Sequence, residues 1–180
     1  MNRHKIILNI TLSGLFIALG LLLPFLTGQI PEIGSMLCPM HIPVLICGFI
    51  CGWKYGLIVG AITPILRSVI FQMPPMYPTA LSMAFELGTY GFVSGFLYNI
   101  FMNKDKNNIL YTFLTLIIAM LSGRIVWGVT KAILLCVGEK SFTFAAFITG
   151  GFLDAVPGII LQLVLVPIIV KIVNKKEKKQ

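Results

Sequence analysis

Charged residues are scarce in this chain. Only 11% of its 180 residues are charged, only six are acidic, and 57% are hydrophobic, which gives a mean hydropathy of +0.94. Soluble globular domains carry about 25% charged residues, so a soluble globular domain is excluded. The net charge of +8 does not indicate nucleic-acid binding either, because the basic residues lie beside apolar runs, where they orient a membrane protein.

Motifs for common catalytic and energy-coupling chemistry are also missing. The sequence has no GxxxxGK[ST] phosphate-binding loop, so ATP chemistry is not expected in this chain. It has no HExxH, serine–histidine or paired-carboxylate motif either. We therefore expect no enzyme, although a membrane-embedded enzyme with Glu86 or Asp154 as general base and His41 beside it is an alternative. The four cysteines have no zinc or redox spacing; Cys47 and Cys51 are expected as small buried hydrophobic residues.

A second alternative is a stand-alone carrier that moves a small molecule together with protons or sodium ions. Glu86 or Asp154 would then bind the coupling ion. Many such carriers are built from internal repeats, and the sequence shows no clear repeat. This observation argues against the carrier.

Long apolar runs dominate what is present. One membrane crossing takes roughly 20 helical residues, so we expect an all-α integral membrane bundle of six transmembrane helices. The bundle would form a single domain over residues 1–180. The expected helices are 6–26, a short or tilted helix at 40–51, then 55–71, 79–102, 109–137 and 142–173.

The basic residues predict the orientation of this bundle. Most of the 14 lysines and arginines fall on one side of the expected helices, which the positive-inside rule assigns to the cytoplasm. Both termini, Lys54 and the turn at 103–108 are therefore expected inside. The turns at 29–36 and 73–77 are expected outside.

Glycines recur with helical spacing in the stretch 38–98. They stand at every fourth residue from Gly48 to Gly60, and again at Gly91 and Gly95. This spacing lines one helix face with small residues, so that another helix can approach closely.

The same stretch carries a resemblance to a known family. Residues 41–71, HIPVLICGFICGWKYGLIVGAITPILRSVIF, resemble the second and third helices of S components of energy-coupling factor (ECF) transporters. The HIP opening and the glycine-rich turn into a second glycine-rich helix carry the likeness, and the length and hydropathy of the whole chain agree with it. S components are substrate-binding membrane subunits of importers for vitamins and related micronutrients.

The resemblance implies a multi-pass protein of the cell membrane that captures its substrate outside and releases it to the cytoplasm. Its partners would be a transmembrane coupling subunit and two ATPase subunits, which use the ATP, with no cofactor in this chain. Gly14 and Ala18 match a small-residue pair that contacts the coupling subunit, although packing within the chain is an alternative. The loop at 27–38 would close over the substrate and offer contacts from Gln29, Glu32 and Ser35, or would simply be a solvated connector.

Five charged residues interrupt the apolar runs at middle or outer depth. On insertion scales each costs about 2.5–3.5 kcal/mol at a helix centre, so they are expected to converge. The five residues are Arg67, Glu86, Arg124, Lys131 and Asp154. One interpretation is a set of structural ion pairs, such as Glu86–Arg124 or Asp154–Lys131.

The other interpretation is a substrate pocket open to the outside. Arg124, Trp127 and Lys131 share one helix face, and Tyr90 lies one turn after Glu86. Trp127 and Tyr90 would then be stacking walls. Because three cations face two carboxylates, the excess positive charge favours a ligand with a carboxylate or phosphate, pantothenate being one candidate.

Overall fold

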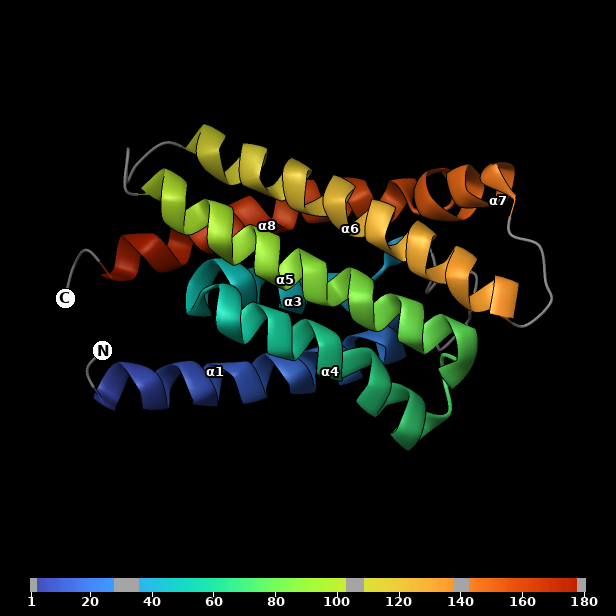
Figure 1. Ribbon diagram of the computed structural model, residues 1–180. Coiled ribbons are helices and arrows are strands. Elements are labelled where there is room, and N and C mark those ends of the chain that lie inside the picture. Colours follow the sequence, from blue (N-terminus) through green and yellow to red (C-terminus); the bar gives the residue numbers. More distant parts are fainter. Residues whose placement is uncertain (1–2, 28–35, 103–108, 138–142, 178–180) are drawn as a thin grey trace.

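The structure is a computed structural model that describes residues 3–27, 36–102, 109–137 and 143–177 (Figure 1). Within these ranges every regular element is helical, which confirms the all-α prediction. The elements are α1 (Arg3–Leu22), η1 (Leu23–Thr27), α3 (His41–Cys51), α4 (Trp53–Phe71), η2 (Met76–Ala80), α5 (Leu81–Met102), α6 (Ile109–Val137), α7 (Phe144–Ile148), η3 (Thr149–Leu153) and α8 (Val156–Glu177).

Four segments of the described chain are long and apolar enough to cross a membrane. They are Arg3–Leu26, Trp53–Phe71, Ile109–Val137 and Val156–Val173. The helix α3 has 11 residues, and α5 has 22 residues but is not one of the four. Six crossings therefore stay a prediction. The lid residues Gln29, Glu32 and Ser35 and the turn at 103–108 lie outside the described residues.

The helices run side by side along one direction (Figure 1). The first turn of α1, the last described turn of α8 and the turn between α3 and α4 lie at one end of the bundle, which we call the terminal end. The connection from α4 to α5 and the helix α7 lie at the opposite end, which we call the distal end. This arrangement agrees with termini on one side of a membrane, and their cytoplasmic position stays a prediction.

The expectation of one continuous helix over 142–173 is wrong. The chain instead forms α7, the wide helical turn η3 and then α8. Gly150 and Gly151 lie in η3, where two adjacent glycines weaken a regular α-helix. Pro157 stands in the first turn of α8, a position where proline is tolerated because its missing N–H needs no partner.

The short second helix is confirmed as α3, and the residues at its ends explain its length. Pro43 lies in the first turn, where proline fits a helix. Gly52 ends the helix with φ 90° and ψ 172°, a conformation that glycine adopts without steric cost. Its N–H donates to the Gly48 carbonyl oxygen at 3.1 Å. The chain can therefore reverse directly into α4.

The helices α4 and α5 meet along a seam of glycines. A Cβ atom built on Gly56 or Gly91 would collide with the other residue's carbonyl oxygen, and one built on Gly60 would collide with the Leu87 carbonyl oxygen. The two backbones are thus in direct contact, as the glycines at every fourth residue predict. The seam fixes the position of α5.

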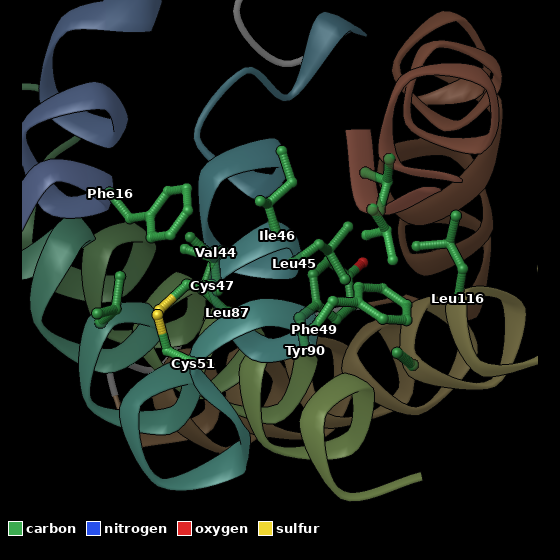
Figure 2. Close-up of a cluster of buried hydrophobic side chains, with 14 of the residues drawn as sticks. Phe16, Val44, Leu45, Ile46, Cys47, Phe49, Cys51, Leu87, Tyr90 and Leu116 are labelled. Carbon is green, nitrogen blue, oxygen red and sulfur yellow. The ribbon is translucent and has the colours of Figure 1, made fainter. Parts of the chain in front are cut away.

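The apolar core lies where α1, α4, α5 and α8 pack around α3, and side chains of α6 complete it. Figure 2 shows Phe16 of α1 beside Val44 of α3, with Leu116 of α6 on the other side of α3. Cys47 and Cys51 are free thiols buried in this core, as expected for small hydrophobic residues. Because α3 is at the centre, the residues at its first turn face the interior of the bundle.

Candidate functional site

Glu86 of α5 is the centre of a buried polar cluster. Its side chain is almost fully buried, and its Oε1 atom lies 3.1 Å from Nη1 of Arg124 on α6. The Tyr90 hydroxyl donates a hydrogen bond to the same oxygen at 3.1 Å. His41 of α3 brings its Nε2 atom to 3.5 Å from that oxygen. Three helices therefore meet at one carboxylate, and the expected Glu86–Arg124 ion pair is confirmed.

Helix geometry explains why these side chains meet. Glu86 and Tyr90 are four residues apart, so they lie on one face of α5, one turn from each other. The Tyr90 ring occupies the space that a side chain at Gly123 of α6 would fill. Gly123 thus lets α5 and α6 come close, and Arg124 follows at once in the chain. The His41 ring lies 5.2 Å from the Tyr90 ring, centroid to centroid.

Cys38 closes the cluster from the segment that leads into α3. Arg124 donates a hydrogen bond from Nη2 to the Cys38 sulfur at 3.6 Å. Burial raises the pKa of the Cys38 thiol, so at neutral pH this sulfur is an uncharged acceptor. Glu86 is therefore the carboxylate that balances the Arg124 charge in the described contacts.

Several hydrogen-bonding atoms of this cluster are left without partners. Among the described residues, Nε of Arg124 and Nδ1 of His41 are buried and make no hydrogen bond, and the only contact of His41 Nε2 in the cluster is the 3.5 Å approach to Glu86. A buried polar atom without a partner costs about 1–3 kcal/mol. Polar groups inside a membrane bundle are commonly tied to function. The cluster therefore has hydrogen-bonding capacity that its own side chains do not use.

Further along α6, Trp127 and Lys131 continue the face that begins at Arg124. Trp127 is buried, and the Lys131 ammonium lies 4.6 Å from its ring centroid. Phe147 of α7 stacks on the Trp127 ring with centroids 6.3 Å apart and occupies the space beside Gly128. The stripe thus continues from Arg124, a member of the Glu86 cluster, and Phe147 of α7 covers it at Trp127.

Arg67 lies at a different place from this cluster. Its Nη1 atom donates to the Leu21 carbonyl oxygen at the end of α1, at 2.8 Å. Its guanidinium also faces the rings of Phe25 and Phe71, at 5.4 and 5.6 Å. These contacts attach α1 to α4. Asp154 is exposed at the turn before α8. A ligand role for either residue stays a prediction that these contacts do not support.

Sequence reasoning missed two members of the cluster. His41 was named only beside the general base of the alternative enzyme and not as a substrate contact, yet only 2% of its surface is exposed and it faces Glu86. Cys38 was not considered as a site residue. The available signal was the position of both residues at the start of a short apolar helix, at the same expected depth as Glu86. No group of three metal-ligating residues occurs in the described ranges.

Gly14 and Ala18 lie on an exposed face of α1. A Cβ atom at Gly14 would have no heavy atom within 4 Å outside α1's own backbone. Gly20 is the contrast, since its Cβ would lie 2.6 Å from the Thr63 methyl group of α4. Packing within the described chain therefore uses Gly20 and leaves the Gly14–Ala18 pair available to another molecule.

Comparison with known proteins identifies the family of this chain. The family model for the ECF transporter substrate-specific component matches residues 8–170, which is most of the chain. Searches of curated proteins and of solved structures found no significant match. The match covers most of α1, the polar cluster on α3, α5 and α6, and most of α8. The chain therefore belongs to the family of ECF transporter substrate-specific components, which are membrane-embedded transport subunits that bind a substrate and are not enzymes.

Proposed function

We propose that this chain is the substrate-binding subunit of an importer for an anionic vitamin or related micronutrient. The substrate would bind from outside the cell, next to Arg124, and be released to the cytoplasm. The observation that carries this proposal is the buried Arg124 side chain, whose Nε atom has no hydrogen-bond partner although Nη1 and Nη2 do.

The chemistry of the site favours an anion. Arg124 and Lys131 lie on one face of α6, and Glu86 is the carboxylate that contacts Arg124. Guanidinium groups bind carboxylates and phosphates in a bidentate manner. A ligand carboxylate would accept hydrogen bonds from Arg124 and, depending on its pose, from His41. Pantothenate, which carries a carboxylate, is the candidate we favour.

Trp127 would give this site an apolar surface. Its ring is buried between Lys131 and Phe147, so a ligand with an aliphatic part could pack against it after α7 moves aside. The loop residues Gln29, Glu32 and Ser35 remain proposed lid contacts. Tyr90 is completely buried and hydrogen-bonded to Glu86. Its proposed role is therefore to orient the Glu86 carboxylate, and it is not a direct ligand contact in this conformation.

Transport energy would come from partner chains. The sequence has no phosphate-binding loop for ATP, and family membership implies association with an ECF module. We propose that a transmembrane coupling subunit docks on the exposed face of α1 at Gly14 and Ala18, and that two ATPase subunits use the ATP. The chain itself would need no cofactor and would reside in the cell membrane as a multi-pass protein.

Titration calorimetry with the purified protein in lipid nanodiscs tests the substrate assignment. Wild type should bind pantothenate, and Arg124→Met should weaken the binding roughly 10- to 150-fold, because a hydrogen bond to a charged group contributes about 1.5–3 kcal/mol. Lys171→Met removes a cation from an exposed position in the last two turns of α8 and should leave the affinity unchanged.

Two results would contradict the proposal at different levels. Absence of pantothenate binding would reject this substrate. Unchanged affinity in Arg124→Met together with lower thermal stability would show that the buried charges are a structural network and not a ligand site.

A further inference from the structure

Gln162 of α8 is a second buried side chain with unused hydrogen-bonding capacity. Only 1% of its surface is exposed. Neither its Oε1 nor its Nε2 atom has a hydrogen-bond partner in the described part of the chain. A carboxamide with neither its acceptor nor its donor satisfied is costly inside a bundle, where leucine would pack without that penalty.

The place of Gln162 on α8 follows from its neighbours. Five buried positions before and along α8 form a stripe in which Gln162 is the polar member: Ala155, Gly158, Gln162, Val166 and Val170. Pro167 is buried beside this stripe. A Cβ atom at Gly158 would lie 2.7 Å from the Leu37 carbonyl oxygen. Val166 and Val170 belong to the core that surrounds α3. The stripe therefore faces the segment that runs from Leu37 into α3.

The level of Gln162 along this segment can be inferred from helix geometry. The chain from Leu37 through α3 and the helix α8 both run from the distal end towards the terminal end (Figure 1). Gln162 lies one turn, about 5.4 Å, beyond the contact of Gly158 with Leu37. Val166, which belongs to the core, follows Gln162 by one further turn. This places Gln162 at the level where Cys38 leads into His41, which are both members of the Glu86 cluster.

We propose that Gln162 is a specificity-determining residue of the substrate site, and that it recognises an amide-type group on the ligand. Its Oε1 would accept a hydrogen bond from a ligand N–H, and its Nε2 would donate one to a ligand carbonyl oxygen. The substrate class is then a carboxylate that also carries an amide, lactam or ureido group. This inference rests on the proposed function, because the anionic end of the ligand would lie at Arg124.

Thr115 provides a matched control. Its hydroxyl is also completely buried and without a partner, but it lies on the opposite edge of the buried face of α6 from Arg124. Thr115 and Arg124 are nine positions apart, which is two and a half helical turns, so their side chains leave α6 in opposite directions. Thr115→Val removes an unpartnered polar group from the interior, as Gln162→Leu does, without touching the proposed site.

The test uses three probe ligands and purified protein in lipid nanodiscs. Pantothenate and biotin carry a carboxylate together with an amide or ureido group, whereas lipoate carries a carboxylate without one. Wild type should bind pantothenate or biotin at least about tenfold more tightly than lipoate. The reason is that lipoate has no amide-type group, so the buried Gln162 carboxamide would stay without a hydrogen-bond partner in that complex. Gln162→Leu should bring these affinities within about threefold of each other, while Thr115→Val should preserve the difference.

Thermal unfolding without ligand gives a second measurement. Gln162→Leu should unfold at the same or a higher temperature than wild type, because it removes a buried group whose hydrogen bonds are unmade. A loss of affinity with unchanged or raised stability supports the proposal. A lower unfolding temperature accompanied by equal weakening of all three probes would show a packing role and overturn it.

Other outcomes also decide the matter. Equal wild-type affinity for lipoate and the other two probes, or no binding of any of them, would reject the assigned substrate class. If Thr115→Val also removed the difference in affinity between lipoate and the other two probes, the specificity could not be assigned to Gln162. Arg124→Met separates this inference from the proposed function, because it should weaken pantothenate, biotin and lipoate alike if the anion site exists.

Discussion

Glu86 and Arg124 form an ion pair of 3.1 Å between α5 and α6, with both side chains almost completely buried. In an apolar interior neither charge can be hydrated, so each depends on the other for compensation. Tyr90 and His41 add contacts to the carboxylate. The pair therefore both joins two helices and holds the Arg124 guanidinium in place.

We expect Glu86→Gln to destabilise the protein by about 3–5 kcal/mol, because it leaves Arg124 without a compensating charge. The double variant with Arg124→Met should recover part of this loss, since both buried charges are then removed. Thermal unfolding of the two single variants and the double variant gives the coupling free energy. Strictly additive losses would show that the two side chains do not depend on each other.

The exposed small residues of α1 predict a separation of binding from transport. Ala18→Trp should disrupt assembly with the coupling subunit while leaving ligand binding by the isolated chain nearly intact, because Ala18 lies on an exposed face. Co-purification of the ECF module and pantothenate titration measure the two properties. Gly20→Leu is the contrasting variant, and it should impair folding because Thr63 occupies the space beside Gly20. Equal loss of both properties in Ala18→Trp would instead indicate a role in packing within the chain.

The glycine seam predicts different costs for two alanine substitutions on either side of it. Gly60→Ala should destabilise the protein by about 1–3 kcal/mol, because the added methyl group collides with the Leu87 backbone. At Gly88 the nearest atom to an added Cβ is 3.6 Å away, so Gly88→Ala should be neutral or slightly stabilising, since alanine favours helices. Thermal unfolding measures both. Similar effects at the two positions would contradict the close contact.

Orientation in the membrane follows from the basic residues and can be measured by labelling. In a cysteine-free background, a cysteine at position 105 should react with a membrane-impermeant maleimide only after the membrane is opened. The variant Met76→Cys places a cysteine at an exposed position in the connection from α4 to α5, and it should react in intact cells. Reaction of position 105 in intact cells would reverse the predicted orientation.

Much of the fold was predictable because apolar run length and glycine spacing are local properties of a membrane protein. The span 109–137 coincides with α6, and the short run at 40–51 coincides closely with α3. The division of the last expected helix was not predicted. Its apolar residues continue without a gap, so hydropathy alone could not show that Gly150 and Gly151 would favour a wide turn over a regular helix.

The site was predictable only in part. Glu86 and Arg124 could be paired because two opposite charges in apolar helices need each other. Arg67 has the same residue type and a similar expected depth, but it bonds the Leu21 carbonyl oxygen at the end of α1. Which of two buried arginines meets the carboxylate depends on how the helices are arranged around α3, and this arrangement is not encoded in spacing along one helix. Gln162 was missed because a single amide in an apolar run carries no charge signal.

The glycine seam between α4 and α5 also has a consequence for the cost of binding a ligand. Side chains that become ordered on binding lose rotational freedom, which reduces affinity by about 0.5–1.5 kcal/mol for each mobile side chain. Backbone contact between Gly56 and Gly91 involves no rotamers, so the helix that carries Glu86 is held before any ligand arrives. Binding a ligand therefore orders few groups of the protein on the α5 side of the site. More of the binding free energy then remains available for moving α7, which covers Trp127.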